Sequence, residues 1–282
     1  MKQGNLLIVH GGAPTAVINS SLYGAVTEAK KHPEVEKVLG AVGGTGGMLK
    51  ENFCDLSAVP EERLKLLLQT PASAIGTSRD ALEPEHYAAM AEICRKHKIR
   101  WVLFNGGNGS MDACGKLFKA CVAAGVDVRV VGIPKTVDND IAVTDHAPGY
   151  ASAARFIAAS VAEVACDVES LPIHVSVIET MGRNAGWLTA ASALARREAG
   201  DGPHLIYLPE RGFRMDWFLE DVERLYRTYG GVVVVCSEGL TNEEGGLLVP
   251  PVFTSGRSVY PSYVGVHLAN TVIKELGIKA RY

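Results

Sequence analysis

Residues 101–140 constrain the fold of this chain more than any other stretch. An apolar run at 101–104 leads into a glycine-rich turn at 105–110 and then into an amphipathic segment, the pattern of a strand, a tight turn and a helix. A second apolar run at 128–133 stops at Pro134 and is followed at once by Lys135, Thr136, Asp138 and Asp140. Because the carboxyl ends of adjacent parallel strands meet at one sheet edge, we expect the glycine turn and these polar residues to lie together.

The first of these two loops has the character of a phosphate-binding turn. Gly106, Gly107 and Gly109 carry no Cβ that would block a phosphoryl group. The amides at the start of the following helix can point at the phosphate oxygens. This loop is therefore a candidate site for a phosphorylated ligand.

The second loop adds groups that suit phosphoryl transfer. Asp138 can remove the proton from an attacking hydroxyl, and Asp140 can hold that hydroxyl in place or bind the water of a metal ion. Lys135 can neutralise charge that develops on the transferred group. Together the two loops predict phosphoryl transfer to an alcohol.

A purely structural interpretation is open for either loop alone. Asp and Asn side chains after Pro134 favour turns because they bond to nearby backbone groups, and glycines at strand-to-helix turns often serve packing. The joint occurrence of both loops at the ends of neighbouring predicted strands favours function.

The alternation of strand, glycine turn and helix recurs along the chain. Expected strands lie at 6–9, 35–42, 175–179, 204–208 and 231–236, and expected helices at 16–31, 60–69, 83–97, 149–166, 187–197 and 216–229. The glycine-rich segment 43–47 is interpreted as a loop that either closes over a ligand or turns a corner. Repeated βα units predict an α/β fold with doubly wound, mostly parallel sheets.

Length, charge and apolar content narrow the function classes. With 282 residues, the chain is long enough for one large α/β domain or two smaller lobes. The net charge of −3, without a block of like charges, argues against a nucleic-acid or anionic-membrane surface. The apolar runs are far shorter than the roughly 18 residues that span a bilayer. The start leaves no room for a signal peptide and the six cysteines lack metal-binding spacing, so we expect a cytoplasmic protein with reduced thiols.

Six sequence motifs, in this order, resemble those of the phosphofructokinase family, which includes diphosphate-dependent enzymes. They are HGGAPTAVIN, SAIGTSR, NGGNGSMD, GIPKTVDND, ETMGRNAGW and SEG, spread from residue 10 to residue 239. The resemblance implies two Rossmann-like lobes, with residues 1–140 binding the phosphoryl donor and residues 141–282 binding the sugar phosphate. It also implies a homodimer or homotetramer.

The resemblance carries site roles onto matching positions of this sequence. Asp138 matches the general base that takes the proton from the 1-hydroxyl of fructose 6-phosphate, Arg183 matches the sugar-phosphate loop, and Glu238 matches a carboxylate that holds a sugar hydroxyl. With Lys135, whose role follows from its charge, Asp138 and Arg183 form the predicted catalytic group. Further residues on the sugar-phosphate side are Thr136, Asp140, His174, Met181, Gly182 and Arg281. The donor side comprises Gly11, Arg79, Asp80, Gly107, Asn108, Gly109 and Ser110.

Three features depart from the family pattern. Asn108 stands where the family usually has an Asp linked to Mg²⁺, the cofactor that the resemblance implies, and His174 replaces an arginine that reaches into the neighbouring subunit's sugar site. Arg281 matches the second arginine of that kind. The sequence ends at Tyr282, before the family's last sugar-phosphate segment, and is therefore expected to be a fragment.

Two residues give opposite indications about the phosphoryl donor. Gly109 leaves space for the α-phosphate of a nucleotide, where an Asp would fill that space and repel the charge. Lys135 resembles the diphosphate enzymes. Giving Gly109 more weight, we predict ATP-dependent phosphorylation of fructose 6-phosphate to fructose 1,6-bisphosphate in glycolysis. The alternatives are diphosphate as donor, a catalytically weak homologue that binds a nucleotide or sugar phosphate, and an NAD-type kinase.

Overall fold

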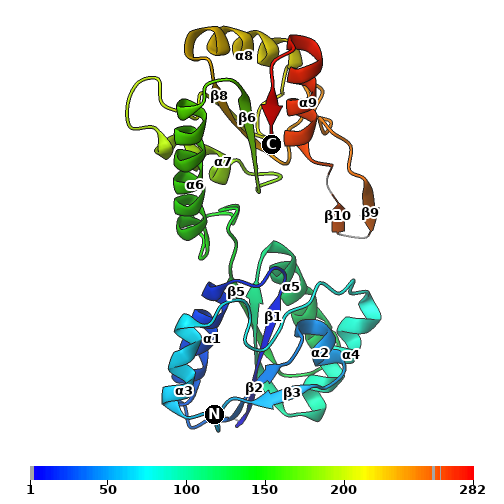
Figure 1. Ribbon diagram of the computed structural model, residues 1–282. Helices are drawn as coiled ribbons and strands as arrows, with labels where there is room; N and C mark the ends of the chain where they lie inside the picture. The colour runs from blue at the N-terminus through cyan, green and yellow to red at the C-terminus, as the bar shows by residue number, and fades with distance from the viewer. Residues whose placement is uncertain (1–2, 256–257, 261) are drawn as a thin grey trace. The chain divides into compact units, whose positions relative to one another are not determined.

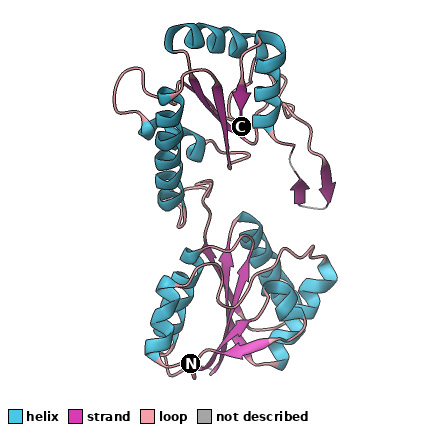
Figure 2. Cartoon of the chain, in the orientation of Figure 1, coloured by secondary structure: helices cyan, strands magenta, loops and turns pink. Residues whose placement is uncertain are grey.

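The computed structural model describes residues 3–255, 258–260 and 262–282, which form two compact units, Met1–Thr136 and Val137–Tyr282 (Figure 1). The two units divide after Thr136, whereas the boundary predicted from the sequence falls after Asp140. Each unit contains a sheet with helices packed against it (Figure 2). The α/β prediction is confirmed.

The sheet of the first unit has the strand order β3-β2-β1-β4-β5. Its strands are β1 (Gly4–Gly11), β2 (Val35–Ala41), β3 (Phe53–Asp55), β4 (Ile99–Gly106) and β5 (Arg129–Pro134). The pairings are parallel except for β3, which runs antiparallel to β2. The helical segments are α1 (Ala16–Ala29), α2 (Gly44–Leu49), α3 (Glu61–Lys65), the 3₁₀ turn η1 (Leu66–Gln69), α4 (Pro84–Lys96) and α5 (Asn108–Ala123).

Alternate residues of β1 pack into cores on opposite faces of this sheet. Leu6 and Ile8 join the cluster that contains Leu22 and Val26 of α1. Leu7 and Val9 join the cluster built with α4 and α5, whose buried members include Met90 and Leu117. A strand whose two faces are both buried is typical of a doubly wound sheet.

The sheet of the second unit has the order β11-β6-β8-β7, and its strands are parallel. The strands are β6 (Val175–Thr180), β7 (Leu205–Tyr207), β8 (Val232–Ser237) and β11 (Ala280–Arg281); a separate hairpin contains β9 (Phe253–Ser255) and β10 (Ser258–Tyr260). The helical segments are α6 (Tyr150–Ser170), α7 (Trp187–Ala191), the 3₁₀ turn η2 (Ser192–Ala195), α8 (Met215–Tyr229) and α9 (Val264–Leu276). Val232 and Val234 of β8 pack with α8 and α9, and Val233 and Val235 pack with α6, so this sheet is also covered on both faces.

The segment 43–47, expected to be a loop, instead begins helix α2. A Cβ on Gly47 would lie 2.0 Å from the carbonyl oxygen of Val42, so the helix approaches the preceding strand more closely than other residues permit. The expected helices at 60–69 and 187–197 are shorter α-helices that continue as 3₁₀ turns. Over the residues that the structure describes, every helix is too short or too polar to span a membrane.

Candidate functional site

Three strands of the first unit end at the same level of the sheet. Gly11 of β1 is in register with Gly106 of β4, and Gly106 is in register with Pro134 of β5. A Cβ on Gly11 or on Gly106 would lie within 2.4 Å of the Ser110 hydroxyl oxygen, so both glycines let α5 sit directly on the strand ends. The glycine turn and the end of β5, with Lys135 and Thr136, therefore meet at one sheet edge as predicted, whereas Asp138 and Asp140 belong to the second unit.

Helix α5 begins at the glycine turn, and its first two residues are exposed to solvent. Gly107 is the N-cap residue, and its carbonyl accepts hydrogen bonds from the amides of Ser110 (2.8 Å) and Met111 (3.1 Å). Asn108 and Gly109 are exposed, and the first amides of a helix have no partner within the helix. A Cβ on Gly107 would make only an ordinary 3.5 Å contact with the carbonyl of Lys135, so internal packing does not require glycine there. This turn therefore has room for an anionic ligand.

Lys135 forms hydrogen bonds from the end of β5 to the end of β4 and to the loop after β1. Its amide donates to the carbonyl of Gly106 at 2.8 Å, and its buried ammonium donates to the carbonyl of Ala13 at 2.8 Å. Thr136, the next residue, is also buried. A positive charge is thus held at the glycine turns.

Arg79 lies in a segment that is tied to the β1 loop. The amide of Gly12 donates to the carbonyl of Ser78 at 3.0 Å, and the hydroxyl of Thr77 donates to the carbonyl of Gly12 at 2.8 Å. Arg79 is exposed, and among the described residues none forms a hydrogen bond or ion pair with its guanidinium. The carboxylate of Asp80 accepts a hydrogen bond from the hydroxyl of Thr45 at 2.5 Å.

In the second unit, Asn139 shapes the loop that carries Asp138 and Asp140. It adopts the left-handed conformation (φ 57°), its side-chain oxygen accepts from the amide of Ala147 at 2.7 Å, and its amide donates to the carbonyl of Asp145 at 3.2 Å. Asn tolerates this conformation better than most residues. Asp138 is half-buried and Asp140 is exposed. Asn139 is not among the site residues predicted from the sequence.

The segments that follow β6 and end β8 are joined by hydrogen bonds. The hydroxyl of Ser237 donates a hydrogen bond to the carbonyl of Gly182 at 2.8 Å, and the amide of Gly182 donates one to a carboxylate oxygen of Glu238 at 3.3 Å. Gly182 has a φ of 113°, which favours glycine. Met181 is exposed and Arg183 is half-buried; no described side chain pairs with the Arg183 guanidinium. The structure therefore brings Met181, Gly182, Arg183 and Glu238 together.

Glu179 is a neighbouring carboxylate that the sequence analysis did not select. It accepts a hydrogen bond from the amide of Gly265 at 2.7 Å, which connects β6 to the start of α9. Burial raises the pKa of Glu179, and the charge of Glu238 raises it further, although the Gly265 hydrogen bond opposes both effects. Glu179 is the first residue of the ETMGRNAGW motif, and this position is the feature of the sequence that could have identified it as a site residue.

His174 and Arg281 lie at the other end of β6. Arg281 is in register with Ser176, and His174 precedes the strand, whereas Met181 follows it. A strand of this length spans roughly 17–20 Å. The side chain of His174 is buried, and burial, together with the charge of Arg281, lowers its pKa. Within one chain these two residues do not join the cluster at the carboxyl end.

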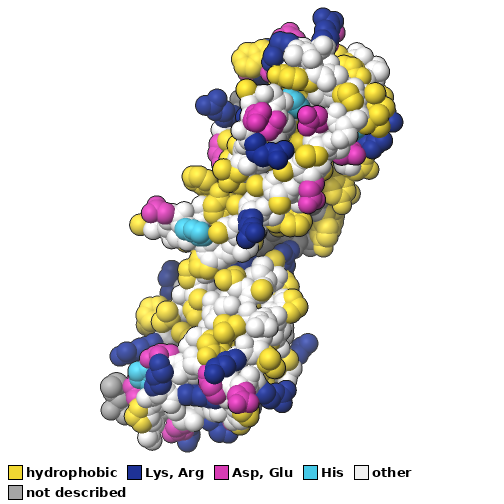
Figure 3. Space-filling model, turned by 60° about the vertical axis from the view of Figure 1, so that its left-hand side comes forward, with side chains coloured by type: hydrophobic (Ala, Val, Ile, Leu, Met, Phe, Trp, Pro, Cys, Tyr) yellow, Lys and Arg dark blue, Asp and Glu magenta, His cyan; other side chains and the backbone are white. Residues whose placement is uncertain are grey.

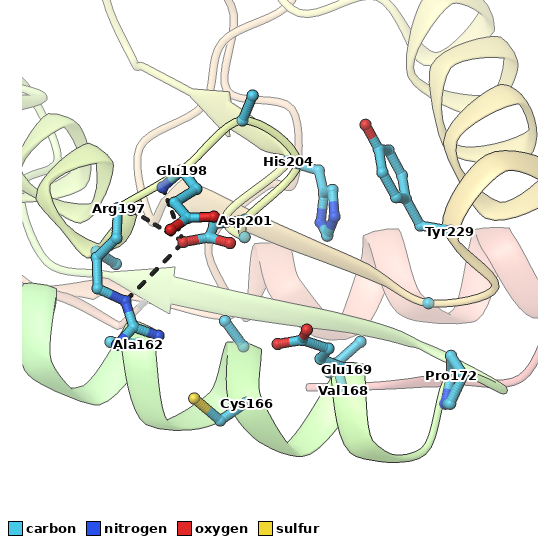
Figure 4. A pocket seen from close by; sticks show the side chains of 16 residues that line it. Ala162, Cys166, Val168, Glu169, Pro172, Arg197, Glu198, Asp201, His204 and Tyr229 are labelled. Atoms are coloured by element: carbon cyan, nitrogen blue, oxygen red, sulfur yellow. Dashed lines mark hydrogen bonds and ion pairs between the residues drawn. The ribbon is translucent and has the colours of Figure 1, made fainter.

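A cavity of about 390 Å³ in the second unit lies at the amino ends of β7 and β8 (Figure 4). Asp201 in its wall accepts hydrogen bonds from the amides of Arg197 (3.0 Å) and Glu198 (3.1 Å). The lining contains the carboxylates of Glu169, Glu198 and Asp201 and the guanidinium of Arg197. This excess of negative charge disfavours a phosphate, and the cavity contains none of the residues selected from the sequence.

The charged side chains of the surface are mixed in sign. On the face shown in Figure 3, Lys and Arg side chains lie among Asp and Glu, in line with the net charge of −3. Within the described ranges, no group of three or more His, Cys, Asp or Glu residues could hold a metal ion. Because Mg²⁺ is commonly held by one or two protein oxygens and the phosphates of a substrate, the exposed Asn108 is compatible with such binding.

Comparison with known proteins shows the family and the fold of this chain. A sequence model described as phosphofructokinase matches residues 5–282. The chain is 42% identical, over 87% of its length, to the pyrophosphate–fructose 6-phosphate 1-phosphotransferase of Rhodospirillum rubrum, and spans 60% of that relative. It is 30% identical to the ATP-dependent 6-phosphofructokinase of Amycolatopsis methanolica, over 82% of its own length and 50% of the relative's. The crystal structure of a pyrophosphate-dependent phosphofructokinase from Marinobacter aquaeolei superposes with a TM-score of 0.83 at 36% identity, covering 99% of this chain and 67% of that one. The chain belongs to the phosphofructokinase family.

Proposed function

We propose that this protein transfers a phosphoryl group from diphosphate to the 1-hydroxyl of fructose 6-phosphate. The observation that supports the donor is the similarity to diphosphate-dependent relatives, at 42% identity against 30% for the ATP-dependent relative. This favours the alternative over our prediction of ATP. Gly109 does not by itself decide the donor, because a missing Cβ removes an obstacle to ATP and does not weaken the binding of diphosphate.

The first unit supplies the groups for the donor in this proposal. Diphosphate binds at the glycine turn, where the first amides of α5 and the positive end of its dipole favour an anion. Lys135 compensates the charge of the leaving phosphate, since its ammonium is already fixed by Ala13. Arg79 binds the donor through its unpaired guanidinium. Mg²⁺, with Asn108 as a protein ligand, neutralises further phosphate charge.

The second unit supplies the groups for the sugar in this proposal. Asp138 accepts the proton of the 1-hydroxyl as the oxygen attacks phosphorus, and the P–O bond to the leaving phosphate breaks. Arg183 binds the sugar phosphate, and Glu238 accepts a hydrogen bond from a sugar hydroxyl. In this proposal the protein works in the cytoplasm, where fructose 6-phosphate is available, as a homodimer or homotetramer to which His174 and Arg281 contribute across subunits.

A coupled assay tests the proposal. Fructose 1,6-bisphosphate formation is measured on one preparation with diphosphate and with ATP, at saturating Mg²⁺ and after chelation. We expect kcat/KM for diphosphate to exceed that for ATP by at least roughly tenfold, which corresponds to about 1.4 kcal/mol. Turnover with neither donor contradicts the proposed reaction.

ATP is a second candidate donor because Gly109 is exposed at the start of α5 and carries no Cβ that would oppose a nucleotide's α-phosphate. A preference for ATP that Gly109→Asp abolishes, with diphosphate use retained, would establish this candidate.

A further inference from the structure

The segment that carries Arg79 is held between two other parts of the first unit. On one side it is bonded to the β1 loop through Gly12. On the other side it meets the start of α2, where a Cβ on Gly44 would lie 2.4 Å from the hydroxyl oxygen of Ser78 and 2.7 Å from its amide. A side chain at position 44 would clash with Ser78, and the positive φ of Gly44 also favours glycine.

Thr45 joins α2 to this segment through its backbone and its side chain. Its amide donates to the hydroxyl of Ser78 at 3.0 Å, and its hydroxyl donates to the carboxylate of Asp80 at 2.5 Å. The hydroxyl oxygens of Thr45 and Ser78 are themselves 3.0 Å apart. Thr45 is buried while Ser78 is half-buried and Asp80 exposed, so these bonds are partly shielded from water.

The carboxylate of Asp80 is directed toward the protein. A Cβ on Gly46 would lie 3.1 Å and 3.2 Å from the two carboxylate oxygens of Asp80. These oxygens therefore pack closely against the backbone of α2 at Gly46. Burial raises the pKa of Asp80, but hydrogen bonds from Ser78, Thr45 and the Gly46 amide outweigh this and lower it. The carboxylate is therefore charged at neutral pH and supplied with donors from its own unit.

This arrangement keeps two adjacent opposite charges apart. Arg79 and Asp80 are neighbours in the sequence, yet no ion pair between them occurs in the part of the chain that the structure describes. A carboxylate that was free to rotate would compete with a phosphate for the guanidinium. Because Thr45, itself bonded to Ser78, bonds to the carboxylate of Asp80, the guanidinium of Arg79 stays available to an anion.

We propose that Thr45, Ser78 and Asp80 form a lock that positions Arg79 for the phosphoryl donor, and that Asp80 acts as a positioning residue and does not bind the donor. The proposal rests on the proposed function, in which Arg79 binds diphosphate. It also gives segment 43–47 a role, since the lock fixes this glycine-rich stretch in place as part of a helix.

A matched pair of variants tests the lock at Thr45, which lies outside the donor-binding residues. Thr45→Val keeps the shape and removes the hydroxyl, while Thr45→Ser keeps the hydroxyl. We expect Thr45→Val to raise KM for diphosphate roughly 10-fold, the scale of one lost hydrogen bond to a charged group, with kcat and KM for fructose 6-phosphate within about twofold of wild type. Thr45→Ser is expected to behave as wild type. Unchanged KM for diphosphate in Thr45→Val overturns the lock.

A double-mutant cycle separates a lock from two independent roles. If Thr45 acts through Asp80, the double variant Thr45→Val, Asp80→Asn raises KM for diphosphate no more than the stronger single variant does. Multiplying effects would overturn the proposal, because they indicate that Asp80 meets the donor directly. Asp80 is exposed, so Asp80→Asn is expected to fold even if Thr45→Val does not.

Amide hydrogen exchange provides a readout without turnover. We expect Thr45→Val to accelerate exchange in peptides covering 44–47 and 76–81, with Thr45→Ser and peptides from the second unit unchanged. If Thr45→Val folds, unchanged exchange in both peptides overturns the lock; if it does not, the same measurement on Asp80→Asn decides. Absence of turnover in wild type, with the exchange result as expected, contradicts the proposed function and leaves the lock supported.

Discussion

A Cβ placed on Gly239 would lie 1.9 Å from the carbonyl oxygen of Arg183 and 2.6 Å from its Cα. The backbone at Arg183 therefore rests directly on the turn that follows β8. Through this contact, a residue selected for sugar-phosphate binding takes its position from a glycine that lies far from it in the sequence.

Gly239→Ala is expected to push the Arg183 loop away and to destabilise the protein by about 1–3 kcal/mol, the usual cost of overpacking. Urea denaturation measures this loss. Gly24→Ala is the control, because Gly24 lies in α1 with no atom within 4 Å of an added Cβ and is expected to gain about 0.5–1 kcal/mol. Equal stability of Gly239→Ala and wild type would contradict the close packing.

Arg183→Ala is expected to raise KM for fructose 6-phosphate roughly 10- to 100-fold, because a charge-assisted hydrogen bond contributes about 1.5–3 kcal/mol. KM for the donor should change little. The control is Arg227→Ala, which removes an exposed guanidinium of α8 that pairs with Glu223. An equal rise of KM for both substrates would show that Arg183 does not act on the sugar specifically.

Asp138→Asn is expected to lower kcat by roughly 10²–10⁴, the scale for loss of a general base, while calorimetry shows substrate binding to be largely retained. Asp145→Asn is the control in the same loop, since only the backbone carbonyl of Asp145 bonds to Asn139. If Asp138→Asn kept most of the wild-type kcat, Asp138 would not be the general base and would serve only to form the turn.

His10 is expected to make the folded state sensitive to acid. Its Nδ1 lies 2.8 Å from the hydroxyl of Ser73, its Nε2 is buried without a partner among the described residues, and burial lowers its pKa to about 4. The unfolded state binds a proton near pH 6.5 and the folded state does not, so stability is retained above pH 6.5 and falls as the pH drops toward 4.

Between pH 7.5 and pH 5 this residue is expected to remove roughly 2 kcal/mol from the free energy of unfolding. His10→Gln should reduce that pH dependence, measured by urea denaturation at both pH values, while His267→Gln, an exposed control, should not. The same pH dependence in His10→Gln and wild type would contradict the assignment.

Local sequence determined the βα units and the residues that lie at the strand ends. Short apolar runs bounded by glycine or proline are strands, and Gly106, Gly107 and Pro134 mark where β4 and β5 end. These features follow from backbone sterics and from the burial of both sheet faces, which act within a few residues. The predicted proximity of Lys135 to the glycine turn is confirmed for the same reason.

Tertiary structure decided what the glycine-rich and polar segments do. Glycine disfavours helix, and segment 43–47 is expected from the sequence to be a loop, but Gly44–Leu49 is a helix whose Thr45 bonds to Ser78 and Asp80, residues 33 and 35 positions away. The direction of the Asp80 carboxylate, the separation of His174 from Glu238 by the length of β6, and the contact of Gly239 with Arg183 depend on the same kind of pairing. Such contacts are fixed by packing between distant segments, which no local pattern of residues encodes.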